Sequence, residues 1–176
     1  QHMAHVAMAI PETGMRRIDD DTVVSPKSFE AAMHAIGAVN AAVDAVFKGE
    51  ADNAFVASRP PGHHAETSTA MGFCLFNHIA IAARHAQKVH GAERIAIIDW
   101  DVHHGNGTQD IFWSDPSVLY CSTHQFPLYP GTGALNETGT KNNIVNAPLA
   151  PQTGSETFRE AFETRILTSL ENFRPD

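Results

Sequence analysis

The sequence is poor in positive charge and has no long hydrophobic run. Its 176 residues include 12 Lys or Arg against 20 Asp or Glu, which gives a formal net charge of −8. Nucleic-acid binding needs clustered Lys and Arg, and the four lysines are scattered, so we expect no nucleic-acid partner. No stretch approaches the roughly 18 apolar residues of a membrane span and no signal peptide is visible, so we expect a cytoplasmic protein without a membrane partner.

Cysteine is also scarce, whereas histidine is abundant. Cys74 and Cys121 each lie inside an apolar run, which predicts two buried free thiols rather than a disulfide. Of the 11 histidines, seven lie between positions 63 and 104. Such a concentration of imidazole side chains favours metal chemistry without establishing it.

Helices and strands are expected to alternate along the chain. Apolar residues at helical spacing predict a first long helix, with Ser25 as its cap and Pro26 in its first turn. Two more helices are expected, over residues 76–90 and after the capping-box pattern Thr153-x-x-Glu156. Short apolar runs predict buried strands at residues 54–57, 94–100 and 118–122. This alternation indicates an α/β fold with a mainly parallel sheet covered on both faces.

Ligands of such sheets bind beyond the carboxyl ends of the strands. Each predicted strand is followed by a polar cluster: 63–64, 99–103 and 122–124. We therefore expect the three clusters to share one rim of the sheet.

The cluster from Asp99 to His103 predicts a metal site. In an extended chain the side chains alternate, so Asp99, Asp101 and His103 face the same way. Two carboxylates on one face repel unless a cation lies between them. A divalent metal on Asp101 and His103, with Asp99 pairing elsewhere, resolves this and is suited to hydrolysis. The alternative is a strand end with solvated carboxylates.

His63 and His64 are adjacent, so they can serve one site only on an irregular backbone, which Pro60-Pro61-Gly62 supplies. Beside a metal, one histidine can act as general base toward metal-bound water and the other as an acid or electrostatic partner. Asp99 and Asn106 are available to orient the second ring nitrogens. The alternative is a pair of surface-loop histidines.

Two aromatic residues accompany these clusters. Phe73 follows Gly72, and Tyr129 precedes a Pro-Gly-Thr-Gly run. If Phe73 and Tyr129 face each other, they form a narrow apolar slot; otherwise each is a core aromatic.

Four motifs carry a family resemblance. They lie at Arg59–Ala65, Gly72–Cys74, Asp99–Gly107 and Tyr129–Gly133. In order and spacing they resemble the zinc-dependent histone deacetylase superfamily, which includes bacterial acetoin-utilisation-type deacetylases and acetylpolyamine amidohydrolases. The resemblance covers roughly positions 10 to 176. Because residue 106 is Asn, the sequence is more similar to the class II and bacterial branch of the family.

The resemblance implies roles for the matching residues. His63 and His64 match the catalytic pair, with Asp99 and Asn106 as their respective partners. A further set matches two zinc ligands (Asp101 and His103), the walls of an acyl-lysine channel (Phe73 and Tyr129) and a backbone acceptor for substrate (Gly72). The chemistry of an Asp and a His ligand also accepts Fe(II) or Co(II).

Two monovalent-ion sites are implied as well. A structural potassium site would use Asp99, Asp101, the carbonyls of His103 and Thr123, and the Ser122 side chain. A second site would use carbonyls near Phe112, Asp115 and Val118.

The implied fold is a three-layer α/β/α, arginase/deacetylase-like domain. We expect residues 1–176 to be one incomplete domain that lacks an N-terminal segment and a C-terminal part. The family's third zinc ligand, an Asp, and its carbonyl-polarising tyrosine are expected beyond Asp176. Two protein ligands are fewer than the usual three, so this piece alone is expected to be inactive.

The implied activity is zinc-dependent hydrolysis of an N-acetyl amide to acetate and a free amine. The expected partner is an acetylated lysine peptide or a small acetylated amine. An acetylpolyamine amidohydrolase is the alternative within the class, and a catalytically silent metal-binding module is the alternative outside it. The physiological substrate and the oligomeric state stay open, with a homo-oligomer among the alternatives.

Overall fold

The structure is a computed structural model that describes residues 1–176. The chain divides into two compact units, Gln1–Gly91 (the N-terminal unit) and Ala92–Asp176 (the C-terminal unit). No helix is both long enough and apolar enough to cross a membrane. Cys74 and Cys121 are buried free thiols, which confirms the prediction.

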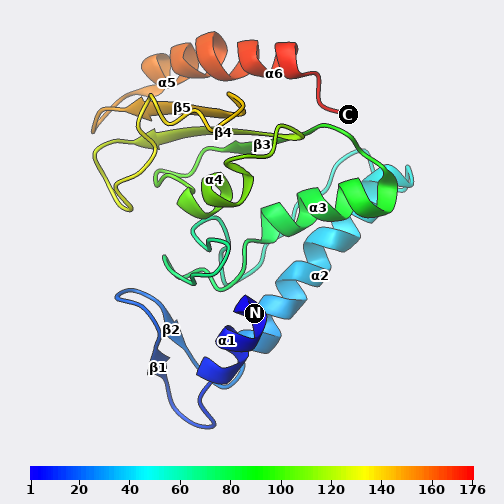
Figure 1. Cartoon of the computed structure of the whole chain (residues 1–176), viewed down its shortest axis with the longest axis vertical. Coiled ribbons are helices and arrows are strands. Elements are labelled where there is room, and N and C mark those ends of the chain that lie inside the picture. Colours follow the sequence, from blue (N-terminus) through cyan, green and yellow to red (C-terminus); the bar gives the residue numbers. More distant parts are fainter. The chain divides into compact units, whose positions relative to one another are not determined.

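The N-terminal unit is built mainly from helices (Figure 1). Its elements are α1 (His2–Ala9), the short antiparallel pair β1 (Arg16–Arg17) and β2 (Val23–Val24), α2 (Ser28–Phe47) and α3 (His78–His90). Helices α2 and α3 lie side by side. The core between these elements consists of Val6, Val24, Ala32, Leu75 and Phe76.

Two helices of this unit follow the sequence prediction, but each begins later than predicted. Helix α2 begins three residues after the predicted cap, because Ser25 lies in a turn in which its N–H donates to Ser28 Oγ at 2.9 Å. Helix α3 begins after Asn77, whose side chain accepts a hydrogen bond from the backbone of Ala80. It ends at Gly91, which has the left-handed conformation of a helix C-cap.

The strand predicted at residues 54–57 is wrong. This segment pairs with no other strand, and the side chain of Phe55 is 93% exposed. An apolar run forms a strand only where a neighbour satisfies its backbone groups, and here there is none. His63 and His64 therefore follow an irregular segment rather than a strand end.

The C-terminal unit is the α/β part of the chain, and it confirms the predicted parallel sheet. Strands β3 (Ile95–Asp99), β4 (Val118–Gln125) and β5 (Ile144–Leu149) form the sheet in the order β3-β4-β5. The register places Asp99 opposite Ser122 and Ser122 opposite Asn146. Figure 1 shows α4 (Asn106–Phe112) on one side of this sheet and α5 (Ser155–Ala161) with α6 (Thr168–Phe173) on the other.

The long helix predicted after Thr153 is present as three consecutive pieces. A π-helical segment, η1 (Phe162–Leu167), joins α5 to α6. Its Ile166 is fully buried and joins a core with Leu119, Cys121 and Ala147. The predicted capping box is wrong, because Gly154 is the N-cap and the Thr153 hydroxyl donates instead to the Ala150 carbonyl.

Candidate metal-hydrolase site

The first predicted site element is the pair His63 and His64, which lies in the N-terminal unit. Their ring centroids are 4.0 Å apart and the ring planes are tilted by 44°. His64 is only 4% exposed, whereas His63 is half-buried. The adjacent rings can lie together because the loop from residue 60 to 65 is irregular, as predicted.

This loop is held against the segment that leads into α3. A Cβ atom on Gly62 would lie 2.7 Å from the His78 backbone nitrogen, so the two backbones are in close contact. The Asn77 side chain donates to the Ala65 carbonyl at 3.2 Å. The same residue that caps α3 therefore also fixes the chain that follows His64.

Gly72 lies against the His64 ring. Its φ of +57° is in the left-handed region, and a Cβ at this position would collide with the imidazole. Phe73, the next residue, also has positive φ, and its side chain is 61% exposed. Its ring is therefore a surface group of this unit and not a core aromatic.

Two residues that sequence reasoning missed anchor this turn. The Gly72 N–H donates to Asp21 Oδ1 and the Phe73 N–H donates to Thr22 Oγ1, both at 3.0 Å. The Thr22 hydroxyl donates in turn to Asp21 at 2.9 Å. The acidic run at residues 19–21 gave no signal for this role, because its partners lie 51 residues away in the sequence.

The second predicted element, from Asp99 to His103, lies in the C-terminal unit. Strand β3 ends at Asp99, so the expectation of an extended chain through His103 is wrong. Instead, Asp99 Oδ1 accepts from the Asp101 N–H at 3.2 Å and Asp101 Oδ1 accepts from the His103 N–H at 2.8 Å. Asp side chains commonly form such local turns, which compete with the extended conformation.

The turn nevertheless brings Asp101 and His103 together. Asp101 Oδ1 lies 3.3 Å from His103 Nδ1, and the two side chains are 50% and 40% exposed. Zinc bonds of about 2.0–2.2 Å at a tetrahedral angle put two ligand atoms about 3.3 Å apart. The donor atoms and their separation therefore fit a zinc ion.

The second carboxylate oxygen of Asp99 is bound by a buried tyrosine. Tyr120 is fully buried, and its hydroxyl donates to Asp99 Oδ2 while accepting from the Gly105 N–H, both at 3.1 Å. Burial and the negative charge of Asp99 raise the pKa of Tyr120 well above its usual value, so it stays a donor. Asn106, the last residue predicted to assist catalysis, is buried at the start of α4.

A second histidine pair, His104 and His124, lies buried beneath this turn and was not assigned a role from the sequence. Their ring centroids are 4.7 Å apart, and the residues are 1% and 2% exposed. Burial lowers the pKa of His104 to about 4 and also lowers that of His124. His124 Nε2 donates to the Gly133 carbonyl, so its Nδ1 accepts from the Ser122 hydroxyl at 2.9 Å.

Gly133 packs against this histidine pair, as Gly72 packs against His64. Its φ is +92°, and a Cβ there would lie 2.6 Å from His104 Cγ. A partly exposed acidic side chain, Glu137, supports the same turn. Burial alone would raise the pKa of Glu137, but hydrogen bonds from Gln109, Gly133 and Ala134 lower it.

The residues of the predicted potassium site share this end of the sheet. Ser122 and Thr123 lie at the register level of Asp99 and just beyond it, and both are buried. The Ser122 hydroxyl lies 2.9 Å from His124 Nδ1 and also interacts with the Tyr120 hydroxyl. The Thr123 hydroxyl is buried without a hydrogen-bond partner.

The three carbonyls predicted for the second monovalent site converge on one point. The Asn143 side-chain nitrogen donates to the carbonyls of Phe112, Asp115 and Val118 at 2.8, 3.0 and 3.1 Å. An amide nitrogen has two hydrogens, so three acceptors exceed its donors. The cluster is therefore rich in oxygen acceptors, which is the environment that hard cations prefer.

The remaining predicted residue, Tyr129, belongs to the C-terminal unit. It is 38% exposed, and its ring lies edge-on to His103 with centroids 6.0 Å apart. A half-exposed aromatic beside a predicted metal ligand fits a substrate wall better than a core role.

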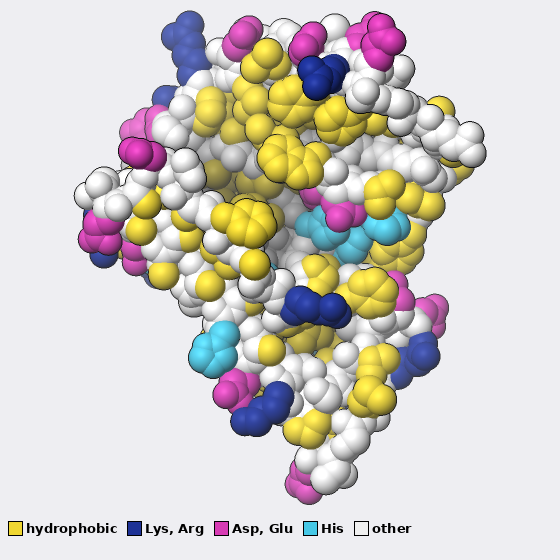
Figure 2. Space-filling view, turned by 180° about the vertical axis from the view of Figure 1, so that it is seen from behind, with side chains coloured by type: hydrophobic (Ala, Val, Ile, Leu, Met, Phe, Trp, Pro, Cys, Tyr) yellow, Lys and Arg dark blue, Asp and Glu magenta, His cyan; other side chains and the backbone are white.

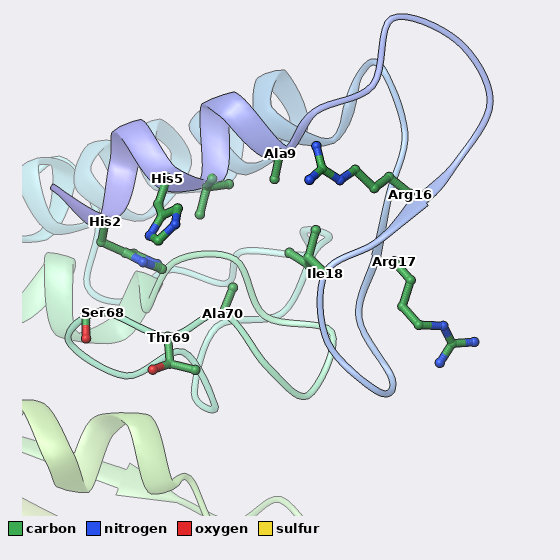
Figure 3. A pocket seen from close by; sticks show the side chains of 10 residues that line it. His2, His5, Ala9, Arg16, Arg17, Ile18, Ser68, Thr69 and Ala70 are labelled. Carbon is green, nitrogen blue, oxygen red and sulfur yellow. The ribbon is translucent and has the colours of Figure 1, made fainter.

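The N-terminal unit has several hollows, and one of about 450 Å³ is lined by the predicted residue Phe73 together with Arg59 and Pro61. Figure 3 shows one of about 360 Å³, in which His2 and His5 of α1 face the loop carrying Ser68 and Thr69 while Arg17 points away. His63 and His64 line neither of these two hollows.

In the C-terminal unit, Asp101 and His103 follow the end of strand β3, and in the N-terminal unit a loop carries His63 and His64. Asp and His are the residue types that metal-dependent hydrolases use. A model of the histone deacetylase domain matches residues 1–176. The chain belongs to the histone deacetylase family.

Proteins similar to this chain are named as deacetylases. A histone deacetylase-like amidohydrolase of Pseudomonas aeruginosa is 42% identical over 99% of this chain and 48% of its own length. A probable deacetylase of Archaeoglobus fulgidus is 46% identical over 90% of this chain and 45% of its own length. The crystal structure of the HDA15 HD domain superposes with a TM-score of 0.93 at 39% identity, over 99% of this chain and 51% of that one. The chain spans about half the length of the relatives it matches.

Proposed function

We propose that the protein to which this chain belongs hydrolyses an N-acetyl amide, releasing acetate and a free amine. Family membership supports hydrolytic deacetylation. The observation that carries the metal-dependent form is the 3.3 Å separation of Asp101 Oδ1 and His103 Nδ1, which suits two ligands of one zinc ion. A third ligand and a carbonyl-polarising tyrosine are expected from the rest of a longer protein.

In this proposal Asp101 and His103 hold the metal. Zinc supplies Lewis acidity, which polarises the acetyl carbonyl and makes a water molecule acidic enough to react near neutral pH. Iron(II) or cobalt(II) suits the same ligands. The local turn fixes the Asp101 carboxylate through the His103 N–H, so the ligand pair is pre-formed.

The histidine pair moves the protons. His64 takes a proton from the attacking water, His63 assists it, and one of them later protonates the leaving amine. The packing of Gly72 against the His64 ring supports this assignment, because it restricts the ring to one position. Asp99 and Asn106 are proposed as the groups that orient the two histidines.

Substrate and monovalent-ion roles follow the same proposal. Phe73 and Tyr129, both exposed aromatics, would contact the acyl-lysine stem, and the Gly72 carbonyl would accept a hydrogen bond from the substrate. Potassium would stabilise the end of the sheet near Asp99 and Ser122. A second monovalent ion would bind the carbonyls of Phe112, Asp115 and Val118, which accept hydrogen bonds from the Asn143 amide, so this side chain would have to turn away.

The proposal is tested with a His64→Ala variant of the full-length protein. Loss of a general base costs about 10²–10⁴-fold in turnover. We therefore expect acetate release from an acetyl-lysine peptide to fall by that factor while the bound zinc, measured by elemental analysis, is unchanged. Unchanged turnover would contradict the assignment of His64 as base.

A small acetylated polyamine is the second candidate substrate. The formal net charge of −8 favours a cationic ligand. On the face shown in Figure 2, Lys and Arg side chains are few and lie apart from one another, so no basic patch opposes such a substrate. Comparing kcat/KM for acetyl-lysine peptide and acetylputrescine distinguishes the two. No hydrolysis of either with zinc, iron or cobalt would favour the silent metal-binding module.

A further inference from the structure

Three metal-ligating side chains meet where α2 and α3 end. Asp44 lies in the last turn of α2, and His85 and His90 lie in the last two turns of α3. Asp44 Oδ1 is 2.6 Å from His85 Nε2 and 2.7 Å from His90 Nε2. The three potential ligand atoms all lie within 4.8 Å of one another. None of the three residues belongs to the motifs that match the deacetylase family.

We propose that Asp44, His85 and His90 bind a divalent transition-metal ion, with zinc as the preferred occupant, which fastens the end of α2 to the end of α3. Two imidazoles and one carboxylate are a common protein ligand set for zinc, with water in the fourth position. The inference goes beyond the proposed deacetylase reaction and does not depend on it.

The geometry requires only a small adjustment. Ligand atoms of a tetrahedral zinc ion are about 3.3 Å apart, whereas the two nitrogen–oxygen distances here are hydrogen-bond distances. Opening each nitrogen–oxygen contact to about 3.3 Å needs a shift of about 0.6 Å, and the same ion would hold the two imidazole nitrogens, which lie within 4.8 Å of each other. The Asp44 side chain is 32% exposed, so it has room to move and the ion has access.

The surroundings favour a cation. Hydrogen bonds from His85 and His90 lower the pKa of Asp44 to about 2, so the carboxylate is charged at neutral pH. Both helices end here, and helix C-termini carry partial negative charge that stabilises cations. The opposing charge is Lys48, an exposed side chain one turn beyond Asp44, which is flexible enough to turn to solvent.

Ring contacts also hold the imidazoles of His85 and His90 in place. The His90 ring stacks on Phe47 with centroids 4.7 Å apart and an interplanar angle of 11°. The His85 and His90 rings meet at 73° with centroids 5.8 Å apart. These side chains are 20% and 14% exposed, so little conformational freedom remains to be lost on metal binding.

The test is a zinc-binding titration of the full-length protein after removal of metal with a chelator. We expect His85→Gln and Asp44→Asn each to bind about one equivalent of Zn²⁺ less than the wild type. His34→Gln is the matched control, because this histidine is also on α2 but its side chain is 82% exposed and outside the cluster. Because the readout is a difference from wild type, zinc bound at Asp101 and His103 cancels.

Asp44→Asn guards against misfolding, because its amide oxygen can still accept hydrogen bonds from the two histidines. A second measurement uses the wild type alone. Zn²⁺ should protect His85 and His90, but not His34, from acylation by diethylpyrocarbonate, as mapped by mass spectrometry. Equal stoichiometry in wild type and variants, or equal modification of His85 and His90 with and without Zn²⁺, would overturn the proposal.

Discussion

Each unit of the chain contains two histidine rings in contact, with a glycine of left-handed conformation packed against them. The two pairs differ in burial. In the N-terminal unit, His63 is half-buried beside the buried His64, with Gly72 against the ring. In the C-terminal unit, His104 and His124 are both buried behind Gly133. The same arrangement of a histidine pair and a glycine therefore occurs once in a partly exposed site and once in a buried site.

The difference in burial bears on which pair suits the proposed proton transfer. A histidine that exchanges protons with a substrate needs access to it and a pKa near the working pH. Burial lowers the pKa of His104 to about 4, so this ring stays neutral near pH 7 and acts as a hydrogen-bond partner of Thr132. The His63–His64 pair has one half-buried ring, whereas both rings of the His104–His124 pair are buried.

The largest expected effect comes from filling the space of the two glycines. Gly72→Ala and Gly133→Ala should each lower the free energy of unfolding by about 2–4 kcal/mol, because left-handed strain adds to a collision with an imidazole. Denaturant unfolding of the full-length protein measures the loss. Gly72→Ala should also reduce turnover about a hundredfold, because it displaces His64.

Matched controls isolate the collision. Gly49 and Gly131 also have positive φ, but a Cβ at either would meet nothing within 4 Å. Their alanine variants should lose only the backbone contribution of about 1–2 kcal/mol. If they lose as much as Gly72→Ala and Gly133→Ala, ring contact does not explain these glycines.

The next largest effect is expected for the two hydroxyl groups that hold turns by hydrogen bonds, those of Tyr120 and Thr22. Tyr120→Phe removes the partner of Asp99 and of the buried Gly105 N–H, so it should cost about 2 kcal/mol. Thr22→Val removes the acceptor of the Phe73 N–H and the hydrogen bond to the partly exposed Asp21, and should cost about 1 kcal/mol. Thermal unfolding of both variants gives the order, and a larger loss for Thr22→Val would contradict it.

The smallest effect is a pH dependence in the N-terminal unit. Burial lowers the pKa of His78 in the folded state, and its Nε2 atom is buried without a hydrogen-bond partner. A depressed pKa means that this contribution to stability is complete above the unfolded value of about 6.5 and is lost as the pH falls below it. His78→Gln should therefore flatten the stability curve just below pH 6.5, and an unchanged slope would exclude His78 as its source.

The sequence predicted the C-terminal unit better than the N-terminal one. Strands β3 and β4 are continuous apolar runs, so the sheet and the position of Asp99 at a strand end could be inferred from hydrophobicity. Strand β5 was missed because Asn146 and Pro148 interrupt its apolar pattern. The side-chain directions after Asp99 were also missed, because local Asp turns replaced the extended chain.

Features that depend on loops were harder to predict from the sequence. The contact of His63 with His64 could be inferred from the irregular Pro-Pro-Gly segment, but its support by Asp21 and Thr22 depends on contacts between distant segments. The cluster of Asp44 with His85 and His90 was missed for the same reason, because it forms only when two helices pack.

The metal-ligand pair is the central claim, and zinc-supported acetate release tests it most directly. Full-length wild type and Asp101→Asn would be stripped of metal, supplied with Zn²⁺ and assayed on an acetyl-lysine peptide. We predict that Zn²⁺ restores activity to the wild type, while Asp101→Asn stays at least about a hundredfold lower. Equal restoration of both proteins would contradict the assignment of Asp101 as a metal ligand.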